Sequence, residues 1–106
     1  KPRVRVPKTA KPGEIIEIKA LISHRMESGQ RRDRKTGERV PRKIINRFEA
    51  MFNGQPVFSM DLEPAVSTNP FIKFFVTMRE SGSFKFIWTD DDGTQYSTTK
   101  SIVVEG

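Results

Sequence analysis

The strongest constraint on this chain is an alternation of apolar and polar residues that returns in segment after segment. Within residues 14–23, every second position is apolar, at Ile16, Ile18, Ala20 and Ile22. Because successive side chains of a strand point to opposite faces of a sheet, this pattern predicts a strand with one buried face. The same alternation recurs at residues 44–52, 72–79 and 84–89. None of these segments is followed by an amphipathic helix, so the chain is predicted to be all-β.

Turn-forming residues separate these segments. Asn53-Gly54 tolerates positive φ at both central positions and predicts a tight hairpin into a return strand at residues 57–60. Because Pro56 has no N–H to donate, this return strand is predicted to start there or to lie at a sheet edge. Residues 81–83 join the next two strands, and the turn at residues 90–93 leads into a last strand at residues 95–104.

The number of strands indicates one architecture. A short first strand at residues 3–6 brings the total to about seven strands. Short strands at this spacing, separated by Pro and Gly, are typical of a small antiparallel β-sandwich of the immunoglobulin-like type. A chain of 106 residues has room for one hydrophobic core, so residues 1–106 are predicted to form a single domain.

Composition excludes several classes of protein. The sequence contains no cysteine, which rules out disulfides, thiolate metal sites and a cysteine nucleophile. The longest apolar stretch, residues 71–76, is interrupted by Lys73, whereas a membrane-spanning helix needs about 18 consecutive apolar residues. The first residues lack the apolar segment of a signal peptide, so export is expected to depend on a partner or on a segment removed earlier.

The positive charge is concentrated in one part of the sequence. The chain has 19 Lys and Arg against 13 Asp and Glu, which gives a net charge of +6. Residues 25–47 hold nine of the bases and three of the acids, or +6, while the other residues hold ten of each and balance. The sequence therefore predicts a local basic surface on an otherwise neutral domain.

The same part of the chain departs from the strand pattern. Residues 25–42 show no sustained apolar periodicity, and connections longer than about 12 to 15 residues are uncommon unless they are functional or disordered. Thr36-Gly37 could close a short projecting hairpin within it. Two interpretations stay open: a solvated loop that keeps the domain soluble, and a basic surface that recruits anionic partners or substrates through its arginines.

The sequence offers little for catalysis or for holding a cofactor. His24 is the only histidine, and no grouping of His, Cys, Asp or Glu has the spacing of a metal site. No catalytic residue, metal or other cofactor is therefore predicted. The acidic run at residues 90–93 begins like a calcium loop, but its twelfth position is Ser101 instead of Glu. A hairpin turn that carries a solvated charge cluster is the favoured interpretation.

Aromatic residues suggest an alternative function. Phe84, Phe86 and Trp88 alternate along one strand, where they are predicted to fill the core and not to form a stacking platform. A basic nucleic-acid-binding β-domain would instead use the basic segment for phosphate contacts and an exposed aromatic such as Phe75 for stacking. A secreted adhesion or structural sandwich without any preference for anions is a third class.

Five strings, in order along almost the whole chain, are distinctive. They are Ser23-His24-Arg25-Met26-Glu27-Ser28-Gly29-Gln30-Arg31, Val40-Pro41-Arg42-Lys43-Ile44-Ile45, Asn69-Pro70-Phe71, Glu80-Ser81-Gly82 and Trp88-Thr89-Asp90-Asp91-Asp92-Gly93. Together they resemble the SoxZ family, the Z subunits of the SoxYZ sulfur-carrier complex in bacterial thiosulfate oxidation. The first two strings are much more specific than the turn motifs.

The resemblance implies an immunoglobulin-like subunit that is not an enzyme and forms a heterodimer with SoxY. In that family the C-terminal Gly-Gly-Cys-Gly-Gly-type arm of SoxY holds the sulfur intermediates on its cysteine. The resemblance further implies transient docking to Sox enzymes such as SoxXA, SoxB and SoxCD. It also implies a periplasmic location, reached by export together with SoxY.

The resemblance and the basic segment together predict a docking surface for partners and anions. The residues chosen for it are Arg31, Arg32, Arg42 and Lys43, with His24 and Met26 as contacts at the root of the loop. A homodimer is expected for the isolated chain, because an unpaired sheet edge or an apolar patch tends to find a substitute partner.

Overall fold

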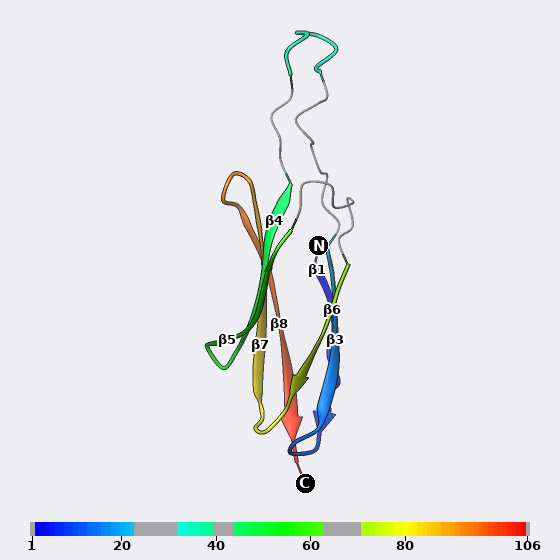
Figure 1. Cartoon of the computed structure of the whole chain (residues 1–106), viewed down its shortest axis with the longest axis vertical. Helices are drawn as coiled ribbons and strands as arrows, with labels where there is room; N and C mark the ends of the chain where they lie inside the picture. Colours follow the sequence, from blue (N-terminus) through cyan, green and yellow to red (C-terminus); the bar gives the residue numbers. More distant parts are fainter. Residues whose placement is uncertain (1, 23–31, 40–43, 63–70, 106) are drawn as a thin grey trace.

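Two sheets pack face to face in the computed structural model (Figure 1), which describes residues 2–22, 32–39, 44–62 and 71–105. One sheet has the strand order β1-β3-β6 and consists of β1 (Pro2–Arg5), β3 (Ile15–Ile22) and β6 (Phe71–Thr77). The other has the order β2-β8-β7-β4-β5 and consists of β2 (Thr9–Ala10), β8 (Gln95–Val104), β7 (Gly82–Asp90), β4 (Ile45–Phe52) and β5 (Gln55–Asp61). No helix in these ranges could cross a membrane. The predicted all-β, immunoglobulin-like sandwich is confirmed.

The N-terminal segment differs from the prediction. Where one strand is predicted, the structure has two, one in each sheet: β1 pairs antiparallel with β3, and β2 pairs parallel with β8. Pro7 lies between them, and because it has no N–H it cannot continue the first ladder. The described ranges therefore hold eight strands with one parallel pair, instead of about seven antiparallel strands.

The predicted inward faces form the core. Phe48, Phe84, Phe86 and Trp88 are each fully buried, which confirms the prediction that the aromatic residues of β7 fill the core. The ring of Phe48 lies 5.0 Å from Trp88 in its own sheet and 6.1 Å from Phe74 of the opposite sheet, measured between centroids. Aromatic contacts therefore join the two layers of the sandwich.

The Asn53-Gly54 turn connects β4 to β5 as predicted. Both residues have positive φ, 49° and 83°, and the flanking Phe52 and Gln55 pair across the ladder, as in a two-residue hairpin of the primed type. Asn53 also binds the start of β7, because its Oδ1 accepts the N–H of Ser83 at 3.0 Å. β5 is an edge strand, in agreement with the prediction made from its proline.

β4 begins with an irregularity that alternation does not reveal. Ile44 and Ile45 are adjacent in sequence, yet both are buried, at 2% and 0% exposure. The register between β4 and β7 shifts between Ile45 and Arg47, and this bulge turns Ile45 toward the core cluster on the same side as Phe48. Ile44 precedes β4 and is buried as predicted, but Ile45 takes its place in the core cluster.

Candidate docking surface

Part of the basic segment forms a small hairpin at one end of the molecule. Within residues 25–42 the structure describes residues 32–39, where Arg32 and Arg39 form an isolated antiparallel bridge and Gly37 has a φ of 73°. The predicted turn at Thr36-Gly37 is thus confirmed. This basic hairpin (residues 32–39) lies beyond the end of the sandwich at which β4 begins (Figure 1, cyan), in a molecule that measures 62 × 20 × 19 Å.

Asp33 organises the tip of the basic hairpin. Its Oδ1 accepts the backbone N–H groups of Lys35 at 2.7 Å and Thr36 at 3.2 Å. Its backbone carbonyl accepts the N–H of Gly37, and its own N–H donates to the carbonyl of Glu38, both at 2.8 Å. A carboxylate that accepts backbone N–H groups two and three residues on is a local turn device. These hydrogen bonds are all internal to the hairpin and need no support from the sandwich.

The basic hairpin presents its cations to solvent. Arg34, Lys35 and Arg39 are exposed, and within the described ranges no carboxylate forms an ion pair with them. Arg32 has a different role, because its Nη1 donates to the carbonyl of Gly37 at 3.1 Å and so supports the turn. The cations best placed to meet an anion are therefore Arg34, Lys35 and Arg39, none of which is among the residues predicted for the docking surface. Their position beside a predicted turn was the available signal, since turn tips are exposed.

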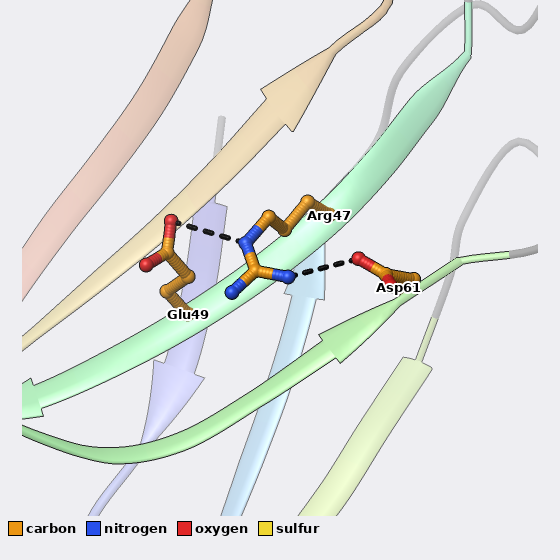
Figure 2. A network of polar contacts seen from close by, with 3 residues as sticks. All are labelled: Arg47, Glu49 and Asp61. Carbon is orange, nitrogen blue, oxygen red and sulfur yellow. Dashed lines mark hydrogen bonds and ion pairs between the residues drawn. The ribbon is translucent and has the colours of Figure 1, made fainter.

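The other predicted site residues fall outside the described ranges. These are Arg31, Arg42, Lys43, His24 and Met26. At the end of the basic segment Arg47 is described, and Figure 2 shows it between two carboxylates. Its Nη1 lies 2.8 Å from Asp61 Oδ1 on β5, and its Nε lies 3.5 Å from Glu49 Oε1 on β4. Arg47 therefore belongs to a network with two carboxylates on the β4–β5 ladder and not to the basic surface.

The acidic turn after β7 lies at the start of β4. Asp91 accepts the backbone N–H of Ile44 at 3.1 Å through Oδ2 and the side-chain amide of Asn46 at 2.9 Å through Oδ1. Asp90 is only 1% exposed, and its Oδ2 accepts the hydroxyl of Tyr96 at 3.0 Å. The predicted turn is confirmed, but the prediction of a solvated charge cluster is wrong for Asp90. That carboxylate is buried because local donors surround it.

No metal centre is found in the parts of the chain that the structure describes, where no cluster of three or more His, Cys, Asp or Glu side chains could hold an ion. The carboxylates of the acidic turn instead connect elements of the sandwich. The described residues thus form a projecting cationic turn at one end of a β-sandwich. Such a surface can attract and orient an anionic partner, since positive potential raises the local concentration of anions.

Comparisons with known proteins agree on the fold. A family model described as sulphur oxidation protein SoxZ matches residues 4–101, and no curated protein matches the chain. A superoxide reductase (neelaredoxin) from Ignicoccus hospitalis has a TM-score of 0.77 at 18% identity over 98% of this chain and 80% of its own. The sulfur carrier protein SoxY from Chlorobium limicola f thiosulfatophilum has a TM-score of 0.69 at 13% identity over 99% of this chain and 79% of its own. At these identities the likeness to the two structures concerns the fold alone.

Proposed function

The chain belongs to the SoxZ family, and on this premise we propose that it is the non-catalytic subunit of a SoxYZ carrier complex in the oxidation of thiosulfate. In this proposal it pairs one-to-one with SoxY, whose C-terminal cysteine carries the sulfur intermediates. The absence of cysteine from the whole sequence supports this division of roles, because the chain has no thiol on which to hold such a cargo. The complex is proposed to act in the periplasm, after export together with SoxY.

The basic hairpin is proposed to dock the enzymes that load and unload the SoxY arm, such as SoxXA, SoxB and SoxCD. One observation carries this proposal: Arg34, Lys35 and Arg39 are exposed on a turn held by its own hydrogen bonds at the end of an elongated molecule. The positive potential would favour anionic thiosulfate and anionic protein surfaces and would weaken as salt is added. The residues chosen from the sequence complete the proposed surface: Arg31, Arg32, Arg42, Lys43, His24 and Met26.

Co-expression tests the proposed pairing. The chain and SoxY should elute from gel filtration as a stable one-to-one complex, and separate elution of the two proteins would overturn the proposal. The isolated chain should not consume thiosulfate, and unaided turnover would contradict its non-catalytic role. Sedimentation of the isolated chain tests the predicted homodimer, which should be replaced by the heterodimer when SoxY is added.

Charge reversal tests the docking role of the basic hairpin. In the intact complex, the double variant Arg34→Glu/Lys35→Glu should slow loading of the arm by about tenfold at low salt. The difference should vanish near 1 M salt, where the Debye length falls to about 3 Å. The control variant Lys85→Glu/Lys100→Glu makes the same change of charge at exposed positions of β7 and β8 and should leave loading unchanged. If the hairpin variant were loaded at the wild-type rate and with the wild-type salt dependence, the hairpin would have no electrostatic role in docking.

A nucleic-acid-binding domain is the alternative, and Phe75 is 61% exposed, as that function requires. A titration with a single-stranded oligonucleotide separates the two functions. If the oligonucleotide binds, and the logarithm of its association constant falls linearly with the logarithm of the salt concentration, the alternative is favoured. No retention at low salt would exclude it.

A further inference from the structure

A second positively charged surface lies on the outer side of the three-stranded sheet. Arg5 of β1 is the register partner of Lys19 of β3, and Lys19 is in turn the partner of Lys73 of β6. Residues that pair across a ladder share a face, and all three side chains are exposed, so they form one row across the sheet. We name the surface around this row the cationic sheet face. Besides the row it comprises Arg3, Ile15, Glu17, Leu21, Phe71 and Phe75, with Glu17 as its acidic member.

The charges of this row are poorly compensated. Like charges directly opposite each other on neighbouring strands oppose folding, so a row of three is unfavourable unless something else offsets it. In the described ranges only Glu17 pairs with the row, at 3.4 Å from Lys19 Nζ, with both side chains at least 40% exposed. No described carboxylate forms an ion pair with Arg5 or Lys73. An anionic group placed over the row would relieve the repulsion.

Apolar side chains border the row on both sides. Ile15, Phe71 and Phe75 are exposed at 66%, 60% and 61%, and they are three of the six large apolar side chains that the described residues expose. On the Phe71 side the surface is hollowed by an open cavity of about 310 Å³, whose walls include Leu21 and Arg3. Large apolar side chains gathered in the open on one face mark a surface that binds another molecule.

The spacing of the aromatic rings favours a protein over single-stranded nucleic acid. Phe71 and Phe75 are four residues apart on one strand, which at about 3.3 Å per residue puts them about 13 Å apart. Neighbouring bases need stacking partners at much shorter intervals, and the intervening outward position holds Lys73 instead of an aromatic residue. The two rings therefore fit separate apolar contacts at the two sides of a charged centre.

A second copy of this chain fits the face poorly. In a two-fold symmetric contact centred on the row, Arg5 of one copy would lie against Lys73 of the other and Lys19 against its own equivalent, so cations would meet cations. Bringing like charges together in an interface is strongly unfavourable. The complementary surface must instead come from a different chain that supplies carboxylates opposite the row and apolar groups opposite the two phenylalanines.

We propose that the cationic sheet face is the surface through which this chain binds the carboxylate-bearing face of its partner subunit. The identity of that subunit as SoxY rests on the proposed function, whereas the location and chemistry of the contact come from the register of β1, β3 and β6. The basic hairpin then stays available for transient partners, because it lies at the end of the molecule and not on this face (Figure 1).

Matched single substitutions test the proposal in the complex with SoxY. Lys73→Glu places an acid in the row and should weaken binding at least tenfold at low salt. Lys85→Glu is the control, since it makes the same change at an exposed position on a strand of the other sheet, and it should change affinity less than twofold. The apolar part is tested by Phe75→Ser, which should weaken binding at low and high salt alike. Circular dichroism and thermal unfolding verify that each variant is folded.

The possible results are distinguishable. If the wild-type chain forms no complex with SoxY, the proposed function fails, and the assignment of this face to that partner fails with it. If the wild-type complex forms and Lys73→Glu binds as well as Lys85→Glu does, the proposed function stands and this face is not the contact. If Lys73→Glu weakens oligonucleotide binding or self-association and leaves the SoxY complex intact, the face serves nucleic acid or a second copy, and the proposal is overturned.

Discussion

The basic hairpin and the cationic sheet face both gather positive charge, but they do so by different means. In the hairpin the cations are close neighbours in sequence, and Asp33 shapes the turn with hydrogen bonds that span only two or three residues. On the sheet face, Arg5, Lys19 and Lys73 are far apart in sequence and meet only through strand register. The comparison shows that a local charge cluster can be independent of the core, whereas a cluster built by register depends on the core beneath it.

The largest effect is expected where the core supports the sheet face. Phe74 is 5% exposed, and its ring stacks on Phe58 at 4.4 Å. Phe74→Ala should lower the free energy of unfolding by about 3–5 kcal/mol, because it removes buried area and leaves a cavity. Urea unfolding measures this change. The neighbouring variant Phe75→Ala is the control and should stay within about 0.5 kcal/mol, since that ring is exposed. Equal losses from the two variants would contradict the dependence of this face on the core.

The next largest effect on stability is expected at the start of β4, where the acidic turn at residues 90–93 is hydrogen-bonded to it. Asp91→Ala removes the acceptor for the N–H of Ile44 and for the amide of Asn46. Hydrogen bonds to a charged group contribute about 1.5–3 kcal/mol, so a loss of that size is expected in the free energy of unfolding. Asp92→Ala, at an exposed position of the same turn, should lower the free energy of unfolding by less than Asp91→Ala does. A smaller effect for Asp91 than for Asp92 would show that the acidic turn does not anchor β4.

A smaller effect, of opposite sign, is expected from the row of cations. Lys73→Gln removes one member of a like-charged set that lies in direct register, so stability should rise by about 0.2–1 kcal/mol at low salt. Thermal unfolding at low and high salt measures this gain, which should disappear when salt screens the charges. Lys85→Gln provides the comparison, because no like charge is its register partner on β4 or β8. If Lys85→Gln raised stability as much as Lys73→Gln does, the effect would come from the lower net charge of the protein and not from the row.

The smallest effect on global stability is expected in the basic hairpin. Asp33→Ala removes the acceptor for the N–H groups of Lys35 and Thr36 and should loosen the turn locally. Because the described hydrogen bonds of this turn stay within the hairpin, the free energy of unfolding should change by less than about 0.5 kcal/mol. Amide hydrogen exchange should speed up at Lys35 and Thr36 and remain unchanged in β3 and β7. A global loss above about 1 kcal/mol would show that the hairpin is coupled to the core.

Most of the fold could be predicted because its signals are short-range. Alternation located the strand at Ile15–Ile22, and the Asn53-Gly54 dipeptide located a hairpin whose φ values are positive. The misses occur where a tertiary contact overrides alternation. The parallel pairing of Thr9–Ala10 with β8 and the bulge that buries Ile45 beside Ile44 depend on partners distant in sequence, and periodicity contains no information about them.

The candidate site was likewise predictable only in the part that depends on neighbouring residues. A charge run and a turn dipeptide were enough to predict the basic hairpin, although its structure assigns Arg32 to the turn and leaves Arg34, Lys35 and Arg39 as the exposed cations. The cationic sheet face was missed because its charges lie in the part of the sequence that balances, ten bases against ten acids. A count of charges along a chain does not show which of them share a face.

The sequence by itself determined that this chain would be a β-sandwich with a basic, turn-forming segment, because alternation, turn residues and charge runs act over a few neighbouring positions. Only the tertiary structure decided that Arg5, Lys19 and Lys73 would stand in one row and that Asp90 would be buried. Register is set by how entire inward faces fit together, and a shift by one residue would turn each side chain of a strand to the opposite face. The row therefore exists only in the packed sandwich.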